Sequence, residues 1–212
     1  MKVLFATKNP AKLKKYSEKL KKYGIDLISI KDLDIDIEVE ENGKDAIENA
    51  YLKAKTYYKA TGLPTIGMDD NLYFEGVSKE DQPGTLVRRV NGKHLDDEEM
   101  ISYYTGLAKK YGGKLEGKWV YGMVLYDGEN AHEHTWSKGG FYFADKASEK
   151  RNPGYPLDSI TIWPEYNKYW LELNDEEKKV INDRFFYDGV PEFLLNSLNI
   201  KENKWINTNK NN

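Results

Sequence analysis

In the N-terminal part of the chain, short apolar runs alternate with one amphipathic stretch. Residues 3–6 and 25–30 are mostly apolar, and short runs of this kind are typical of buried strands. Between them, Pro10 suits the first turn of a helix, apolar side chains follow at helical spacing, and Gly24 stands at the natural end. The pattern therefore predicts a strand, a polar turn, a helix and a second strand.

The rest of the chain continues this alternation. Asn174 and Glu177 have the spacing of a capping box, which predicts the start of a helix. The predicted helices cover residues 45–58, from Asp96 or Asp97 to about 111, 174–186 and 191–198. The predicted strands cover residues 65–68, 119–126, 132–136 and 141–144, with Asp69 and Asp70 at the C-terminal end of the first. Strands that alternate with helices predict an α/β protein with a mixed sheet.

Composition narrows the functional classes. The chain has 212 residues, with 32 Lys and Arg against 35 Asp and Glu, so it lacks the basic excess of proteins that grip duplex nucleic acid. Cysteine is absent, which excludes disulfides, a thiolate nucleophile and cysteine-held metal sites. No apolar run approaches the roughly 18 residues of a membrane-spanning helix, and there is no signal-peptide core. We expect a cytoplasmic protein with one domain over residues 1–198 and a polar tail over 199–212.

Three polar features combine phosphate-binding and metal-binding chemistry. Thr7, Asn9 and Lys12 lie at the first strand-to-helix junction, where free backbone N–H groups attract phosphate. An acidic cluster that includes Glu41 follows. The acidic pair at residues 69 and 70 is expected at a strand end, where ligand sites of α/β sheets gather. Lysines bind phosphate, carboxylates bind Mg²⁺, and a carboxylate also activates water.

The order and spacing of these motifs resemble the inosine triphosphate pyrophosphatase (Ham1-like) family of nucleotide hydrolases. The resemblance covers residues 3 to about 89 and then about 153 to 184. The matching motifs are Ala6-Thr7-x-Asn9-x-x-Lys12, Glu40-Glu41-x-Gly43, Glu48-Asn49-Ala50-x-Leu52-Lys53-Ala54, the segment from Pro64 to Asp69-Asp70, Pro83-Gly84 with Arg89, and Glu176-Glu177-Lys178 with Arg184.

This resemblance implies both a fold and a reaction. The implied fold is an elongated α/β domain in which two lobes surround a mixed sheet and a nucleotide binds in the cleft between them. The usual assembly is a homodimer. The implied reaction cleaves a nucleoside triphosphate to a monophosphate and pyrophosphate with Mg²⁺. Such transfer depends mainly on positioning and charge neutralisation, which Lys, Asp and Glu side chains supply.

The resemblance also assigns individual residues. Glu41 and Asp70 would bind Mg²⁺, and Asp70 is the candidate for orienting or deprotonating the attacking water, with support from Asp69 and Lys12. The residues assigned to the triphosphate are Thr7, Asn9, Lys12 and Lys53. The other residues assigned to the substrate are Arg89, Tyr155, Asp158, Lys178, Asp183 and Arg184.

The sequence departs from the family pattern mostly in the half that would hold the base. The aromatic loop of the family becomes Gly154-Tyr155-Pro156-Leu157-Asp158, and its Ser-His-Arg signature becomes Asn182-Asp183-Arg184. A carboxylate only accepts hydrogen bonds, so Asp183 would repel the 6-oxo group of inosine and favour an exocyclic amine. We therefore hypothesise that an amino-bearing base is favoured over a 6-oxo purine.

Two alternative assignments stay open. The Maf-like pyrophosphatases share the fold class, although the Asp-Asp pair and the Asn-x-x-Lys opening favour the Ham1-like assignment. The second alternative is a catalytically weak nucleotide-binding protein, a sensor or sponge on the same fold. Lys15, which replaces a glutamate of the family, and a shortened loop after the acidic pair support it. The presence of Glu41, Asp70, Lys12 and Lys53 argues against it.

Overall fold

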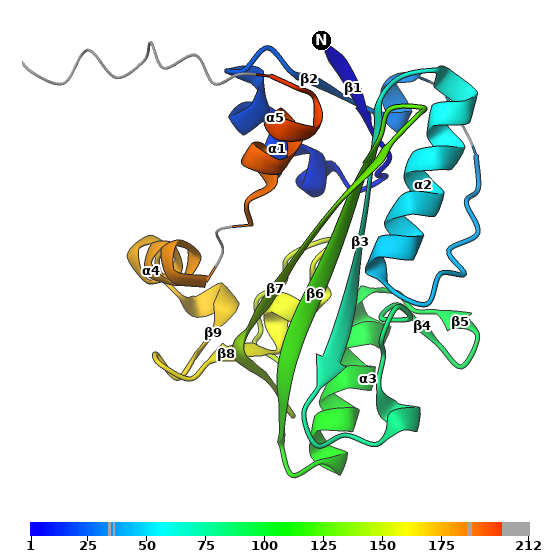
Figure 1. Cartoon of the computed structure of the whole chain (residues 1–212). Helices are drawn as coiled ribbons and strands as arrows, with labels where there is room; N and C mark the ends of the chain where they lie inside the picture. The colour runs from blue at the N-terminus through cyan, green and yellow to red at the C-terminus, as the bar shows by residue number, and fades with distance from the viewer. Residues whose placement is uncertain (34, 36, 186–187, 201–212) are drawn as a thin grey trace, which may run out of the picture.

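A computed structural model describes residues 1–33, 35, 37–185 and 188–200, with the side chains of Ala11, Arg184 and Phe185 left out. The tail expected over residues 199–212 lies almost entirely outside this range. Within it, a mixed seven-stranded sheet carries helices on both faces (Figure 1). The predicted α/β class with a mixed sheet is confirmed.

The sheet is parallel at one edge and antiparallel over the rest. Its strands are β1 (Lys2–Phe5), β2 (Asp26–Ser29), β3 (Thr65–Phe74), β6 (Lys114–Tyr126), β7 (Ala131–Ala144), β8 (Thr161–Trp163) and β9 (Lys168–Tyr169). They follow the order β2-β1-β3-β6-β7-β8-β9, and only the two pairs that include β1 are parallel. A separate hairpin pairs β4 (Arg89–Val90) with β5 (Lys93–His94).

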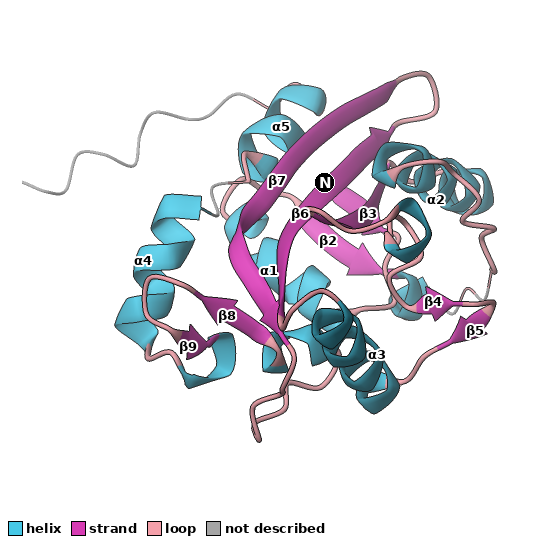
Figure 2. Cartoon of the chain, turned by 90° about the horizontal axis from the view of Figure 1, so that it is seen from below, coloured by secondary structure: helices cyan, strands magenta, loops and turns pink. Residues whose placement is uncertain are grey.

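The described helices are α1 (Pro10–Lys21), α2 (Ala46–Thr61), α3 (Asp97–Lys110), α4 (Asp175–Phe185) and α5 (Val190–Ser197). The starts of two helices follow local sequence signals. Asp96 caps α3 in a capping box, and Asn174 and Glu177 form the predicted capping box before α4. α2 lies on one side of the sheet, and α1 and α5 lie on the other (Figures 1 and 2). Among the helices described, none has both the length and the apolar character needed to cross a bilayer.

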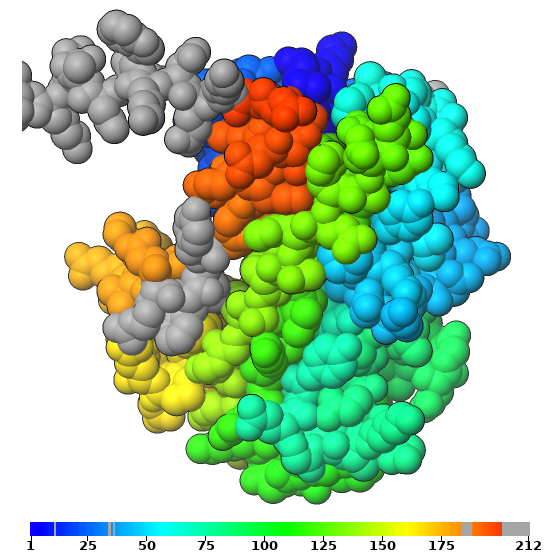
Figure 3. Space-filling view, viewed as in Figure 1, coloured from blue at the N-terminus to red at the C-terminus, as the bar shows by residue number. Residues whose placement is uncertain are grey.

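The side chains on one face of β3 pack into two separate cores, which define two lobes of the molecule. Ile66 and Met68 pack in a core with α1 and α5, which we call the first lobe. Leu72 and Phe74 pack in another core with α3 and β8, which we call the second lobe. Side chains at alternate positions of a strand share a face, so Asp70 lies on this same face between the two cores. In Figure 3 the first lobe includes the red α5 and the second includes the yellow segment.

On the opposite face, two glycines allow α2 to approach the sheet closely. A Cβ atom on Gly67 of β3 would lie 1.9 Å from the carbonyl oxygen of Ala50. A Cβ atom on Gly122 of β6 would lie 2.6 Å from the carbonyl carbon of Ala46. Only glycine fits at these contacts, since no real Cβ atom tolerates such distances to a neighbouring backbone. The approach brings the side chains of α2 directly beside Asp69.

The structure corrects two predicted strand boundaries. The predicted end of a strand at residue 68 is wrong, because β3 pairs with β6 continuously from Thr65 to Phe74. Asp69 and Asp70 therefore lie within a strand and not at its C-terminal end. The runs 132–136 and 141–144 belong to one strand, β7, because Ser137 and Lys138 continue the antiparallel pairing with β6, which resumes at Phe141 after a register shift between the two strands.

Candidate active site

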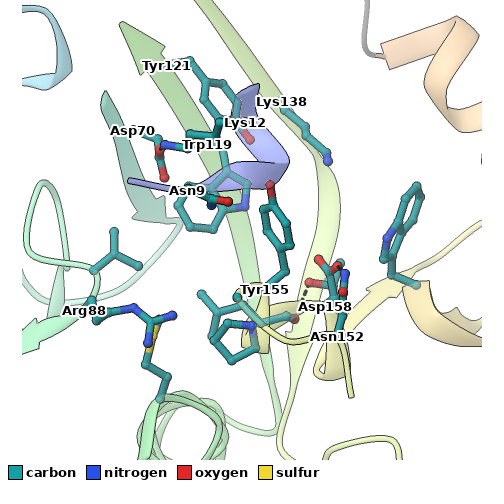
Figure 4. A pocket seen from close by; sticks show the side chains of 17 residues that line it. Asn9, Lys12, Asp70, Arg88, Trp119, Tyr121, Lys138, Asn152, Tyr155 and Asp158 are labelled. Carbon is teal, nitrogen blue, oxygen red and sulfur yellow. Dashed lines mark hydrogen bonds and ion pairs between the residues drawn. The ribbon is translucent and has the colours of Figure 1, made fainter. Parts of the chain in front are cut away.

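The centre of the candidate site is an ion pair between α1 and β3. The Nζ of Lys12 donates a hydrogen bond to Oδ1 of Asp70, and the two side chains point toward one another (Figure 4). Burial alone would lower the pKa of Lys12, but the charge and hydrogen bond of Asp70, together with Asp69 and Tyr155, raise it. Burial alone would raise the pKa of Asp70, but the charges of Lys12 and Lys53 hold it below its usual range. Both groups are therefore ionised at neutral pH.

The loop between β1 and α1 presents polar groups beside this pair. The backbone N–H of Asn9 donates to Oγ1 of Thr7 at 3.1 Å, a local bond that turns the chain toward the helix. Pro10 then begins α1. Asn9 lines the same pocket as Lys12. A helix start with a lysine in its first turn provides the N–H groups and the positive charge that attract phosphate.

Asp69 lies on the opposite face of β3, against α2. Its Oδ1 accepts a hydrogen bond from Lys53 at 2.9 Å, and its Oδ2 accepts one from Nδ2 of Asn49 at 2.9 Å. The Nζ of Lys53 also lies 3.2 Å from Oε1 of Glu41. Asp69 is thus engaged by protein groups and positions Lys53, whose charge still acts on Asp70.

A pocket of about 410 Å³ opens beside the ion pair, on the face of the sheet between the lobes. Asp70, Tyr121 and Trp136 lie opposite one another on β3, β6 and β7, and the rings of Tyr121 and Trp136 stack at 5.0 Å. The residues that line the pocket are Asn9, Lys12, Asp70, Val87, Arg88, Met100, Trp119, Tyr121, Lys138, Asn152, Gly154, Tyr155, Pro156, Leu157, Asp158, Thr161 and Trp170 (Figure 4). The pocket therefore combines the charged groups of the ion pair with aromatic surface.

The other end of the pocket is formed by the turn that precedes β8. Asp158 lies in the short 3₁₀ helix η3 (Pro156–Ser159) and accepts a hydrogen bond from Nδ2 of Asn152 at 2.8 Å. Burial raises the pKa of Asp158, although the Asn152 hydrogen bond and the charges of Lys138 and Lys178 act against this. Tyr155 contributes its ring to the same wall.

A smaller pocket of about 260 Å³ adjoins the first and shares Lys12, Tyr121, Lys138, Tyr155 and Trp170 with it. Lys15 also lines it. The Nζ of Lys15 lies 2.9 Å from Oδ2 of Asp188, and this oxygen accepts the hydroxyl of Tyr16 at 3.2 Å. The cation that replaces a glutamate of the resembling family is thus neutralised by a carboxylate from the segment before α5.

The structure brings together several of the predicted site residues and leaves others apart. The predicted residues that line the pocket are Asn9, Lys12, Asp70, Tyr155 and Asp158. Lys53 and Glu41 gather instead around Asp69 on the face toward α2. Arg89 is exposed in β4, and its neighbour Arg88 lines the pocket instead, held by Asp97 at 2.9 Å.

The prediction that Asp183 reads the base is not supported by its position. Its side chain is 64% exposed and pairs with Lys179, one turn earlier on α4, so it stays on the outer surface of that helix. Lys178 borders the pocket through Trp170, because its Nζ lies 5.6 Å from the centre of that ring. The side chain of Arg184 lies outside the described part of the chain.

The predicted metal ligands do not form a complete cage. Asp70 is paired with Lys12, and Glu41 is paired with Lys53. Among the described residues, no three His, Asp or Glu side chains are grouped to hold an ion. The carboxylate oxygens of Asp70 nevertheless fit an ion that arrives with a substrate, because Mg²⁺ is usually held by one or two carboxylates together with phosphate oxygens and water.

Sequence reasoning missed several residues of the pocket. Trp119, Tyr121 and Lys138 lie on two adjacent antiparallel strands, and their side chains meet only through the register between β6 and β7. The alternation of Trp136 and Lys138 along β7 was a usable signal, because alternate positions of a strand share a face. Arg88 was not predicted as a site residue because the neighbouring Arg89 is the one that fits the family motif.

Comparisons with known proteins identify relatives of this chain in sequence and in fold. The model of the Ham1 family matches residues 3–186. A dITP/XTP pyrophosphatase of Mannheimia succiniciproducens is 31% identical and covers 86% of this chain and 92% of its own, and one of Aquifex aeolicus is 30% identical over 87% and 91%. The solved structure of the Staphylococcus aureus Ham1 protein superimposes with a TM-score of 0.71 at 23% identity, covering 93% of this chain and all of its own. A Mycobacterium abscessus structure, titled nucleoside-triphosphatase and dITP/XTP pyrophosphatase, gives 0.66 at 26% identity, with the same coverage.

Proposed function

The chain belongs to the Ham1 family, and on that premise we propose that it is a nucleoside triphosphate pyrophosphatase. It hydrolyses a ribo- or deoxyribonucleoside triphosphate to the monophosphate and pyrophosphate with Mg²⁺. The observation that carries the proposal is the Lys12–Asp70 pair, which joins a phosphate-type helix start to a carboxylate in a pocket of nucleotide size.

The pair explains how the site holds opposite charges until substrate arrives. Without substrate, Lys12 and Asp70 neutralise each other in a partly buried position. A triphosphate that enters at the start of α1 competes for the Lys12 ammonium, assisted by Asn9 and the N–H groups of the helix. Asp70 then loses its hydrogen bond to Lys12, while the nearby charge of Lys53 still acts to lower its pKa. It is free to orient a water molecule.

The chemical step is the attack of that water on the α-phosphorus. The water oxygen forms the new bond to phosphorus, the bond to the oxygen that bridges the α- and β-phosphates breaks, and pyrophosphate leaves. Asp70 accepts the proton of the water, and Lys12 neutralises charge on the phosphate oxygens. Asp69 is a positioning residue, because it holds Lys53 and Asn49 and does not face the pocket.

Mg²⁺ is the ion that we assign to this site. Asp70 would hold it together with substrate phosphates, and Glu41 is the second carboxylate proposed for it. When bound, the ion neutralises phosphate charge and favours departure of pyrophosphate. The proposal also includes the homodimer and the cytoplasmic location that the family resemblance implies.

The residues at the end of the pocket assigned to the base support a base preference that differs from the one in the names of the relatives. With Asp183 on the outer surface, the carboxylate that lines the pocket apart from the Lys12–Asp70 pair is Asp158. A carboxylate accepts hydrogen bonds and favours a base that carries an amino group. The proposed preference for an amino-bearing base therefore rests on Asp158.

A second candidate function is nucleotide binding with little turnover, as in a sensor or sponge. The observation that favours it is Lys15, a cation beside the pocket where the family carries a glutamate. Binding of a triphosphate without release of pyrophosphate would support this candidate over the first.

The position of bond cleavage tests the proposed reaction. The protein is incubated with Mg²⁺ and a panel of nucleoside triphosphates in water enriched in heavy oxygen, and the products are analysed by mass spectrometry. The expected result is pyrophosphate without label and a monophosphate with one labelled oxygen. Release of inorganic phosphate and a diphosphate would contradict the proposal.

A further inference from the structure

The end of the pocket that holds Asp158 also holds a lysine that the proposed reaction does not use. Lys138 on β7 lines both the larger and the smaller pocket. Figure 4 shows it reaching toward the pocket, with Asp158 across the same space. The charge of each residue acts on the pKa of the other. A hydrogen-bond donor and an acceptor therefore face the same volume.

The register of the sheet fixes the position of Lys138. It lies opposite Trp119 of β6, which in turn lies opposite Leu72 of β3, in the row of residues next to that of Asp70. Its Nζ lies 5.5 Å from the centre of the Trp170 ring. An ammonium among aromatic rings is poorly hydrated, so a ligand oxygen placed against it makes a strong hydrogen bond.

The same end of the pocket offers flat apolar surface. Tyr155 directly precedes the turn that carries Asp158, and Trp170 lies beside Lys138; aromatic rings of this kind stack on bases with little dependence on sequence. The distribution of groups is therefore that of a base site, with ring faces for stacking and one charged group of each sign for the edge of the base.

We propose that Lys138 and Asp158 together select a guanine-type base. The Lys138 ammonium donates to the 6-oxo group, and the Asp158 carboxylate accepts from N1–H and the 2-amino group. This inference rests on the proposed function, whose base site it defines. It makes Lys138 a specificity-determining residue of this chain.

The other common purines lack one half of this match. Adenine carries a 6-amino group, which would place a donor against the donor Lys138. Xanthine carries a 2-oxo group, which would place an acceptor against the acceptor Asp158. Hypoxanthine keeps the 6-oxo group and N1–H but has no 2-amino group. A site with partly buried charged groups rejects mismatched bases strongly, because the wrong base displaces water from those groups without replacing its hydrogen bonds.

The test compares kcat/KM for GTP, ITP, XTP and ATP in the wild type, Lys138→Met, Lys138→Arg and Asp158→Asn. Lys118→Met is the matched control, since Lys118 is exposed on the neighbouring strand β6 and does not line the pocket. We expect Lys138→Met to lower kcat/KM for GTP and ITP by about 10- to 100-fold, the usual effect of losing a hydrogen bond from a charged group. ATP is expected to change by less than about threefold, and Lys138→Arg should recover part of the GTP activity. Asp158→Asn should lower the ratio of GTP to XTP by about tenfold.

Calorimetric binding of the product monophosphates separates this inference from the proposed function. If no triphosphate is cleaved but GMP binds more tightly than IMP, XMP and AMP, and Lys138→Met removes that order, the inference holds and the proposed function fails. If pyrophosphate is released but Lys138→Met leaves the order of the four bases unchanged, the proposed function holds and this inference is overturned. An equal loss for all four bases would also overturn it, because that result indicates a structural role only.

Discussion

Asp69 and Asp70 are neighbours in the chain, yet their carboxylates lie on opposite faces of β3. Asp70 pairs with Lys12 of α1 in the pocket, whereas Asp69 is bound by Lys53 and Asn49 of α2. This follows from the strand geometry, in which successive side chains alternate between faces. The acidic pair therefore has two different tasks, one in the pocket and one in anchoring α2 to the sheet.

The anchoring task predicts a loss of stability. The Asp69 and Lys53 side chains are only 14% and 13% exposed, so Asp69→Ala leaves a shielded ammonium with the Glu41 carboxylate and the carbonyl oxygen of Met68 as partners. We expect the free energy of unfolding to fall by about 2–3 kcal/mol, as measured by urea denaturation. Asp183→Ala breaks an exposed pair and should cost less than about 1 kcal/mol. Equal losses in the two variants would contradict the anchoring role.

The close approach of α2 to the sheet predicts a second effect on stability. In Gly67→Ala the new methyl group would meet the Ala50 carbonyl oxygen at 1.9 Å, so α2 and β3 must separate. We expect a loss of about 3 kcal/mol or more in urea denaturation. Gly106 lies within α3 and has no atom near its Cβ position, so Gly106→Ala should stabilise the protein by about 0.5–1 kcal/mol. A Gly67→Ala variant as stable as wild type would show that α2 does not pack as described.

Lys138 predicts a pH-dependent difference in stability. Burial lowers its pKa to about 8 from the ordinary 10.5, with the charge of Lys15 acting in the same direction and that of Asp158 against it. When the pH lies between these two pKa values, the unfolded chain binds more protons at Lys138 than the folded chain does. The destabilising effect of the buried Lys138 charge therefore declines as the pH rises. Lys138→Met should therefore have a higher Tm than wild type at pH 7, and the difference should shrink toward pH 10.5. A difference in Tm that is constant across this range would contradict burial of the charge.

The outer position of Asp183 predicts that its substitution leaves base selection intact. In Asp183→His the change occurs at an exposed site whose partner is Lys179. We expect the order of GTP, ITP, XTP and ATP in a pyrophosphate-release assay to match that of wild type, with ratios within about twofold, since exposed substitutions away from a site have small effects. A changed order of the four nucleotides in Asp183→His would show that α4 brings Asp183 to the base.

Local sequence signals predicted the parts of the fold that depend on neighbouring residues. Pro10 and Gly24 indicated the first helix, and Asn174 with Glu177 indicated the fourth. The full length of β3 was missed because polar residues follow Met68 and end the apolar run. Pairing with β6 extends the strand, and that pairing joins residues far apart in the chain.

The residues of the candidate site likewise include some that local motifs predict and others that only strand pairing brings together. Lys12 and Asp70 were found through motifs whose spacing is fixed by one strand, one turn and one helix. Lys138 was missed because it enters the pocket only through the register of β7 on β6. The outward position of Asp183 was within reach of sequence reasoning, since Lys179 precedes it by one helical turn and offers a local partner.

The proposed function requires Asp70 to accept the proton of the attacking water, at the end of the pocket where Lys12 binds phosphate. The most direct test is the rate of pyrophosphate release with Mg²⁺ and GTP for wild type, Asp70→Asn and the control Asp26→Asn, an exposed aspartate of β2. We expect kcat to fall by about 10²- to 10⁴-fold for Asp70→Asn, the usual contribution of a residue that accepts a proton in the reaction. Asp26→Asn should match wild type. Pyrophosphate release by a folded Asp70→Asn variant at the wild-type rate would show that Asp70 does not accept this proton.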